Sequence, residues 1–500
     1  MTFNSWAYVL LALIVVPLHW LLPHRFRTPF LVLVNFGVYS LWRWEFTFLL
    51  LFSTSVDFIC AKAVNRTDNQ TIRRLWLAGT LVINLGILAY FKYTYFFLDN
   101  VGAASGLLGF APFSHSSLGL SIILPLGISF YTFHSISYTV DVYRRHILPA
   151  DSYLKFLAFV TFWPQLVAGP ILRASEIIPQ LEAERRLNWD MVSSGLALIV
   201  VGLFKKVAIA DNVAPFVDFW FNRDPHLLTA LDVWNSTFLF GFQIYFDFSG
   251  YSDIAIGSAL LLGIVFPDNF NWPYMATSPR DFWQRWHISL SSWIRDYLYL
   301  PLTGQKFKSR SSGGVSQSTG GISVAVQAQA DASKTRALFL TWAIMGLWHG
   351  AAWTFVLWGL YHSAMIWLYR AIKPLNRLME KVPVAGWLLT LPVAMAGWIF
   401  FRANNVSQAV IMFGKLLNPS EYYLSPEIVG LSNPTAGWSY LYSAVIMGGM
   451  IAVFLLQRSP TLLSLPKWFT ESVRTCYLAV MLFAVVLLME QTTQFIYFQF

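Results

Sequence analysis

The stretch TWAIMGLWHGAAWTFVLWGLYH, residues 341–362, is apolar enough to lie inside a membrane, yet it carries a histidine near its centre. Ionisable groups within a bilayer are costly, so His349 is by default a functional candidate. At helical spacing three large side chains share the face of this histidine, which predicts aromatic and thioether walls around the imidazole. They are Trp342, Met345 and Trp353. The alternative is a structural histidine bonded to a backbone carbonyl.

The composition of the whole chain agrees with a membrane location for this stretch. Of the 500 residues, 56% are hydrophobic and only 12% are charged, against roughly a quarter charged in soluble proteins. Apolar runs close to the roughly 20 residues that cross a bilayer recur along the chain. We therefore predict an all-α polytopic membrane protein with one integral membrane domain over residues 1–500. Within it, the small residues Gly346 and Gly350 are expected to let a second helix approach closely.

The net charge of +9 does not indicate nucleic-acid binding, because Lys and Arg occur in short clusters between apolar runs. Membrane topology explains these clusters better, since basic residues accumulate in cytoplasmic loops. Cys60 and Cys476 show no CxxC or Cys/His spacing, so neither a disulfide framework nor a metal site is expected. The run 6–22 lacks a basic flank and a small-residue cleavage site, which predicts a retained first span.

The basic clusters predict the orientation of the chain. The first strong cluster follows the run 46–60 and is placed in the cytoplasm, which puts the N-terminus outside. The segment 99–119 has no Lys or Arg and is expected outside, and the basic pair Arg144 and Arg145 marks the return. Continued along the chain, the apolar runs predict about eleven or twelve crossings.

Several segments depart from simple spans. Residues 153–186 are interrupted by prolines and are expected to form a re-entrant segment buried in protein. The sequence YFDFSGYSD separates the runs 231–246 and 254–266, so Asp247 and Asp253 either cap helix ends or face a reaction cavity. Residues 304–334 are rich in Gly, Ser, Gln and Ala, which is typical of a flexible cytoplasmic loop.

The segment 281–299 is amphipathic and predicts an interfacial or partly buried helix. Asp281 and Arg285 face each other four residues apart, and a polar stripe is expected at intervals of four. The stripe consists of His287, Ser291 and Arg295. Arg285 and Arg295 suit phosphate groups, while the alternative is that the arginines and tryptophans of this segment anchor the helix at the lipid headgroups.

Taken together, the two histidine-bearing segments are the best candidates for a reaction centre. Burial disfavours an imidazolium, so His349 is expected to be neutral and able to accept a proton from a hydroxyl or thiol. No GxSxG elbow, Walker loop or GxGxxG fingerprint is present in the sequence. A covalent serine hydrolase or a nucleotide-driven pump is therefore poorly supported.

Six stretches in sequence order then show a resemblance to a known family. They are LPLGISFYTFHSISYTVDVYR, AGPILR, GLFKKVAIAD, YFDFSGYSDIAIG, RDFWQRWHISLSSWIRDYLYLPL and GLWHGAAWTFVLWGLYH. Together they closely resemble the membrane-bound O-acyltransferase family, and within it the bacterial branch typified by alginate O-acetyltransferase. The likeness covers nearly the whole chain and ends in the FIYFQF tail. One departure is TGQKFK after YLYLPL, where the branch usually has a short Gly-Gly-Asn-Arg turn.

The resemblance implies a helical bundle with a reaction chamber inside the inner (cytoplasmic) membrane of a bacterium. It implies that His349 is the principal catalytic residue and His287 the second active-site residue. The expected reaction takes acetyl from a cytoplasmic thioester, acetyl-CoA, without a bound cofactor or metal. The acetyl group would pass to a periplasmic SGNH-type partner or to an exopolysaccharide such as alginate or cellulose, beside a polysaccharide synthesis and export complex.

Two other functions remain open from the sequence. The same fold could carry a D-alanyl or peptidoglycan O-acyltransferase. In a different class, a membrane transporter could use the same polar groups as a substrate path, although no internal repeat of the kind typical of transporters is evident.

Overall fold

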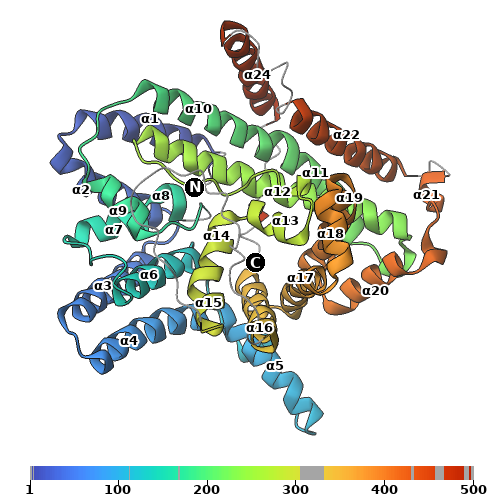
Figure 1. Cartoon of the computed structure of the whole chain (residues 1–500), viewed down its shortest axis with the longest axis horizontal. Helices are drawn as coiled ribbons and strands as arrows, with labels where there is room; N and C mark the ends of the chain where they lie inside the picture. Colours follow the sequence, from blue (N-terminus) through green and yellow to red (C-terminus); the bar gives the residue numbers. More distant parts are fainter. Residues whose placement is uncertain are drawn as a thin grey trace. The chain divides into compact units, whose positions relative to one another are not determined.

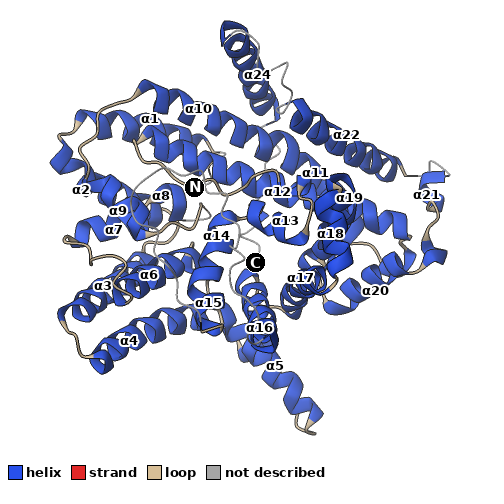
Figure 2. Ribbon diagram, viewed as in Figure 1, coloured by secondary structure: helices blue, strands red, loops and turns tan. Residues whose placement is uncertain are grey.

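The computed structural model describes residues 3, 5–111, 113–166, 169–304, 331–429, 433–456, 467–488 and 495–496. Every regular element in these ranges is a helix, which confirms the all-α prediction (Figures 1 and 2). Six helical stretches of the described chain are long and apolar enough to cross a membrane, so the protein is a multi-pass membrane protein. They are Glu45–Arg66, Gln70–Leu107, Trp189–Phe221, Pro383–Arg402, Pro434–Leu456 and Glu471–Leu488.

This number is smaller than the predicted eleven or twelve crossings, because several apolar runs form helices shorter than a bilayer is thick. The described residues of the segment 153–186 form three short helices and no long one, and the predicted re-entrant placement of this segment in the membrane stays a prediction. The three helices are α7 (Tyr153–Thr161), α8 (Trp163–Leu166) and α9 (Ala174–Glu182).

The described chain groups into two compact units, and the first comprises Met1–Leu196, Ala255–Pro267 and Arg295–Gly313. The single domain predicted from the sequence stays a prediction. The other helices of this unit are α1 (Trp6–Leu21), α2 (His24–Ser40), α3 (Glu45–Arg66), α4 (Gln70–Leu88), α5 (Thr94–Leu107), α6 (Ile128–Tyr143) and α15 (Leu300–Leu302).

In the first unit, helices α3, α4 and α6 pack side by side (Figure 1). Asn69 caps the start of α4 by accepting hydrogen bonds from the backbone of its first turn. The Arg73 guanidinium is buried and donates to the carbonyl oxygens of Val64, at 3.0 Å, and Tyr143, at 2.5 Å. These carbonyls lie in the last turns of α3 and α6, so one side chain satisfies polar groups at both helix ends.

The second unit comprises Ala197–Ile254, Asp268–Ile294 and Gly314–Phe500. Helices α10 (Trp189–Leu203) and α12 (Ala230–Leu261) contribute residues to both units. The other helices of the second unit are α11 (Asp211–Phe221), α13 (Pro279–Arg285), α14 (Ile288–Ile294), α16 (Asp331–His349), α17 (Trp353–Ala371), α18 (Lys373–Lys381), α19 (Pro383–Arg402), α20 (Val406–Leu417), α21 (Pro426–Val429), α22 (Pro434–Leu456) and α24 (Lys467–Leu488).

Helices α16 and α17 form a tightly packed pair, as the two glycines predicted. A Cβ on Gly346 would lie 2.1 Å from the carbonyl oxygen of Phe355, and one on Gly350 would meet the Phe355 ring. On the facing helix, a Cβ on Gly359 would lie 2.1 Å from the carbonyl oxygen of Trp342. Small residues therefore bring the two backbones into contact beside His349.

The predicted break at YFDFSGYSD is wrong, because α12 runs through it without interruption. A Cβ on Gly250 would lie 2.6 Å from the carbonyl oxygen of Gly202. The glycine therefore marks a close crossing of two helices rather than the end of a span, and the aspartates on either side of it meet lysines of the neighbouring segment.

The prediction of a single helix over 281–299 is also wrong. The segment consists of α13, α14 and the π-helical turn Arg295–Tyr299, with a break at Trp286 and His287. In the predicted flexible loop 304–334, residues 305–330 lie outside the described residues, and the last four residues belong to α16.

Candidate active site

His287 occupies the junction between α13 and α14. Ser278 starts α13 by accepting a hydrogen bond from the Asp281 backbone N–H at 3.1 Å, and the helix ends at Arg285. The backbone of His287 has a φ of +42°, in the left-handed region that residues other than glycine rarely adopt. Such conformations cost free energy and cluster at functional sites, so the imidazole is held where a regular helix would not place it.

The His287 ring is fixed by a network around Asn269. The imidazole Nδ1 lies 3.1 Å from Asn269 Oδ1, which also accepts from the Ser289 hydroxyl at 2.8 Å and the Ser289 backbone N–H at 3.3 Å. A backbone N–H can only donate, so the Asn269 atom facing it is the amide oxygen. His287 Nδ1 must therefore carry the proton. The Asn269 amide donates in turn to Ser252 Oγ at 3.1 Å.

The other ring nitrogen of His287, Nε2, is buried and has no hydrogen-bond partner among the described residues. Phe248 packs its ring at 4.6 Å from the imidazole in an edge-on contact. His287 lies outside the candidate membrane spans, and burial lowers the pKa of its imidazole to about 3. With Nδ1 protonated, the neutral ring presents Nε2 as an acceptor.

His349 is the last residue of α16, where Gly350 and the residues after it break the helix before α17. Its side chain is buried, at 4% exposure. The imidazole makes edge-on contacts with Trp358, at 5.0 Å between ring centres, and with Phe401, at 5.5 Å. The histidine therefore lies among aromatic side chains, as the sequence predicted, and shares α16 with Trp342 and Met345.

An aromatic cluster in the second unit connects the surroundings of both histidines. We define it as Phe270, Trp286, Trp358, Trp398 and Phe401. Phe270 contacts the His287 ring at 6.4 Å and the ring of Trp286 at 5.2 Å. Trp286 contacts Trp398 at 4.9 Å, and Trp398 contacts Trp358 at 6.1 Å. A continuous series of ring contacts therefore leads from one histidine to the other within one compact unit.

Two of the three predicted wall residues are buried, and one of them, Trp342, lies beside this cluster. Trp342 packs 4.5 Å from Trp283 and 6.4 Å from Trp358, and Met345 is 2% exposed. The prediction of a shared helical face is wrong for Trp353, because α16 ends at His349 and Trp353 starts the next helix with 54% of its surface exposed. A role for Trp342, Met345 and Trp353 in a reaction chamber stays a prediction.

The three residues of the predicted polar stripe have separate partners: His287 bonds to Asn269, Ser291 to the Trp286 carbonyl, and Arg295 to Asp296. Arg285 lies before the break at His287 and pairs with Asp281 at 2.7 Å, as its spacing predicted. Ser291 donates its hydroxyl to the carbonyl oxygen of Trp286 at 3.3 Å. These two contacts hold the turn around His287, and a direct role of either side chain in substrate binding stays a prediction.

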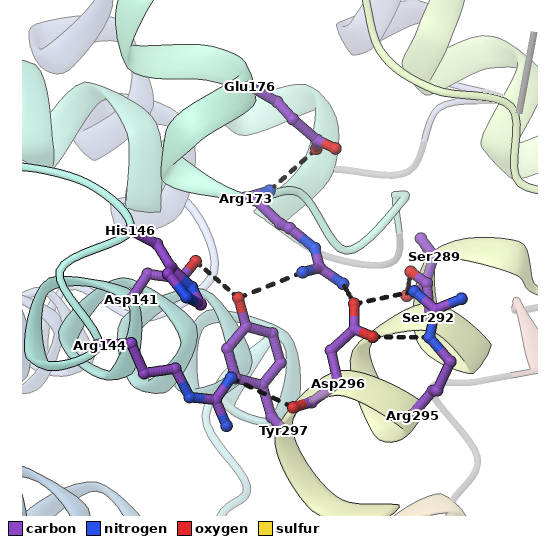
Figure 3. A network of polar contacts seen from close by, with 10 residues as sticks. All are labelled: Asp141, Arg144, His146, Arg173, Glu176, Ser289, Ser292, Arg295, Asp296 and Tyr297. Carbon is purple, nitrogen blue, oxygen red and sulfur yellow. Dashed lines mark hydrogen bonds and ion pairs between the residues drawn. The ribbon is translucent and has the colours of Figure 1, made fainter. Parts of the chain in front are cut away.

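Arg295, the last residue of the predicted stripe, belongs to the first unit and to a network of polar contacts (Figure 3). Its guanidinium lies 2.6 Å from Asp296 Oδ1, and Arg173 pairs with the same carboxylate. Tyr297 donates to Asp141 Oδ2 at 2.7 Å. Arg295 therefore already binds a buried carboxylate, and phosphate binding by Arg295 remains a prediction.

Asp247 and Asp253 form ion pairs with the two lysines of GLFKKVAIAD. Lys206 Nζ lies 2.6 Å from Asp247, and Lys205 Nζ lies 2.6 Å from Asp253. Asp247 also accepts a hydrogen bond from the Ile496 backbone N–H at 2.9 Å. The predicted capping of helix ends is wrong for both aspartates, since α12 continues past them, and a role in a reaction cavity stays a prediction.

Two residues near the histidines were not singled out from the sequence. Asn269 lies in a loop, and no spacing links it to His287, which follows 18 residues later. His362 is buried and packs 5.0 Å from Trp283 and 5.1 Å from Trp358. The only sequence signal for His362 was its place in an apolar run, a signal that it shares with His349.

The fold is that of a multi-pass membrane protein, and its buried histidines are candidate catalytic residues. Residues 144–318 match the model of the membrane-bound O-acyltransferase family. A probable alginate O-acetylase of Azotobacter vinelandii is 36% identical over 428 residues, which cover 85% of this chain and 80% of that protein. The chain belongs to the membrane-bound O-acyltransferase family and is an O-acyltransferase.

Relatives with other substrates in their names are also similar to this chain. A peptidoglycan O-acetyltransferase of Helicobacter pylori is 36% identical over 413 residues, which cover 77% of this chain and 72% of that protein. A teichoic acid D-alanyltransferase of Bacillus subtilis is 28% identical over 285 residues, covering 55% of this chain and 66% of that protein. The relatives therefore share the family with this chain, but their names give different acyl groups and acceptors.

Proposed function

We propose that this O-acyltransferase takes acetyl from acetyl-CoA on the cytoplasmic side of the inner membrane and delivers it for O-acetylation of a periplasmic exopolysaccharide such as alginate or cellulose. The choice is supported by the coverage of the alginate relative, which is 36% identical over 85% of the chain, against 77% of the chain for the peptidoglycan O-acetyltransferase. The buried histidines supply what the chemistry needs, since acyl transfer to a hydroxyl requires a proton acceptor.

In the proposed reaction, His349 is the general base. It takes the proton of the attacking hydroxyl as the oxygen bonds to the thioester carbonyl carbon. The carbon–sulfur bond then breaks, and the thiolate of coenzyme A receives the proton from the imidazolium. Because His349 is 4% exposed among aromatic rings, water that would hydrolyse the acetyl group is kept away from the base.

The oxyanion formed at the carbonyl needs a hydrogen-bond donor. The sequence allowed either His287 or a tryptophan N–H in this role. With its proton on Nδ1, His287 has none to donate from Nε2. Trp358 fits better, because its indole N–H is buried beside His349 and has no hydrogen-bond partner in the described chain.

The protein partners follow from the same proposal. A periplasmic SGNH-type acetyltransferase would receive the acetyl group or act beside this enzyme, within a polysaccharide synthesis and export complex. Acetyl-CoA is a substrate in this scheme, so no bound cofactor or metal is assigned.

The test uses the variant His349→Ala in a strain deleted for the chromosomal gene. We expect loss of polymer O-acetylation, measured as ester acetate released by alkali, while the variant protein remains in the membrane fraction. His226→Ala is the control, because this histidine lies on an exposed turn. Normal acetylation with His349→Ala would refute the role of this residue as the base.

A second acceptor is supported by the similarity to a peptidoglycan O-acetyltransferase. In the same deletion strain, loss of O-acetyl groups from purified peptidoglycan, with an unchanged exopolysaccharide, would favour this acceptor.

A further inference from the structure

We propose that Asn269 is a positioning residue of the acetyl-transfer site, which holds His287 in the tautomer that presents an unprotonated Nε2. The proposal rests on the function proposed above, because it assigns His287 to the same reaction. In this proposal a loop residue, Asn269, determines which ring nitrogen of His287 carries the proton.

Three contacts fix the orientation of the Asn269 amide. Two donors of Ser289, its backbone N–H and its hydroxyl, both point at Oδ1, at 3.3 and 2.8 Å. On the other side, Nδ2 donates to Ser252 Oγ at 3.1 Å. A flipped amide would place an N–H against the backbone N–H of Ser289, so this orientation is the one that satisfies all the donors.

The backbone around Asn269 is fixed as firmly as its side chain. Its carbonyl oxygen accepts from the Ile288 N–H at 2.9 Å, and the Asn271 N–H donates to the carbonyl oxygen of Arg285 at 2.9 Å. These two bonds join the loop directly to the residues on either side of His287. Asn269 is 1% exposed, so water does not compete for its hydrogen bonds.

The consequence for His287 is a defined chemical role. With Nδ1–H bonded to Asn269, the ring offers an acceptor lone pair on Nε2, and that atom is buried without a partner among the described residues. A buried acceptor normally has a donor, so an O–H of the bound substrate is the expected partner. Nε2 thereby orients the acceptor substrate through one of its hydroxyls, while His349 takes the proton of the hydroxyl that attacks the thioester.

The groups that surround His287 are uncharged or neutralised. Phe248 and Phe270 flank the ring, and Asn269 and Ser289 are neutral hydrogen-bonding side chains. Of the charged residues close to these groups in sequence, Asp247 pairs with Lys206 and Arg285 pairs with Asp281, and Asp268, next to Asn269, is exposed to solvent. A carboxylate placed at position 269 would therefore be a new charge in contact with the imidazole, and would favour its protonated form.

Two substitutions at position 269 separate positioning from folding. Asn269→Leu removes the acceptor, and we expect about a tenfold to hundredfold lower kcat, the usual effect of losing such a supporting contact. Asn269→Asp keeps an acceptor for Nδ1–H, and we expect activity at high pH with the acid limb of the pH–rate profile raised by about one unit or more. A merely structural role would not move the pH profile.

The rates are measured in membrane vesicles of a deletion strain carrying each variant, with labelled acetyl-CoA as the probe and polymer ester acetate as the readout. The matched control is Asn271→Leu, because this asparagine lies two residues away with an exposed side chain. In a His287→Ala background, Asn269→Leu is expected to cause no further loss, because the two residues act as one unit.

Three outcomes would overturn the inference. They are an unchanged rate with Asn269→Leu, an unmoved pH profile with Asn269→Asp, and additive losses in the double variant. Absence of acetyl transfer by the unmodified protein would instead refute the proposed function. The thermal midpoint of each purified variant in detergent shows whether a lost rate reflects unfolding.

Discussion

The ammonium of Lys206 lies 2.6 Å from Asp247 Oδ1 and 2.7 Å from Asp211 Oδ1, and less than a tenth of each of the three side chains is exposed. One buried cation thus bridges two buried carboxylates. Breaking such an arrangement from one side is costly, because it leaves charge buried without compensation. The Ile496 backbone is attached to the same arrangement through Asp247.

Replacing Lys206 with methionine is therefore expected to destabilise the protein by about 3–5 kcal/mol, the range for removing one partner of a buried pair. The measurement is the thermal midpoint of the purified protein in detergent, followed by tryptophan fluorescence. Adding Asp247→Asn should restore part of the loss, because one of the two uncompensated charges is then removed.

Lys205→Met is the matched control on the adjacent residue. The side chains of Lys205 and Asp253 are 22% and 18% exposed, so partial hydration of Asp253 should make the loss smaller. Equal losses for the two lysines would contradict the assignment of Lys206 as the more critical charge.

The substitution Gly359→Ala is expected to destabilise the helix pair next to His349. The new Cβ would lie 2.1 Å from the backbone carbonyl oxygen of Trp342, so α17 must move away from α16. Overpacking of this kind costs about 1–3 kcal/mol or more. The thermal midpoint in detergent measures the loss.

Gly86→Ala in α4 provides the control for this substitution, because nothing lies within 4 Å of a Cβ at that position. Alanine favours a helix over glycine by about 0.5–1 kcal/mol, so the midpoint should stay the same or rise. A loss as large as that of Gly359→Ala would mean that helical glycines matter here for a reason other than close packing.

The helical fold was predictable because composition and apolar runs determine it without knowledge of distant contacts. The prediction was wrong where charged residues of two distant segments pair with each other. The sequence YFDFSGYSD looked like a break, since its aspartates appeared unpaired in an apolar run. The structure pairs them with Lys205 and Lys206, which lie more than 40 residues earlier, so the helix continues.

The candidate site likewise contains residues that the sequence predicted and residues that it did not. His349 and His287 were found because an ionisable group in an apolar stretch, or in a recurring motif, is visible in one segment. Asn269 was not found, because its role depends on a loop that folds back onto the turn at His287. That turn was itself missed, since a φ of +42° at a histidine leaves no signature in the residue pattern.

His287 should make the stability of the protein sensitive to acid. Burial sets the pKa of the folded-state imidazole at about 3, against about 6.5 in an unfolded chain. Below about pH 6.5 the unfolded state therefore binds the proton more readily, and stability falls as the pH drops towards 3. In His287→Gln, the thermal midpoint should depend less on pH between 6.5 and 4.5.

His226→Gln is the matched control, because it makes the same substitution at an exposed histidine. If both variants kept the full acid sensitivity of the unmodified protein, the loss of stability would come from groups other than His287.

The neighbouring residues Arg73 and Arg74 offer a direct test of how the first unit is held together. Arg73 is buried and donates to carbonyl oxygens at the ends of α3 and α6, whereas Arg74 is exposed. Arg73→Met would leave these carbonyls buried without their donor, at a cost of about 1–3 kcal/mol for each unsatisfied group. Arg74→Met removes the same charge from the same helix and should change the thermal midpoint little. Similar losses in both variants would show that the cationic charge, rather than the bonds to the helix ends, stabilises this unit.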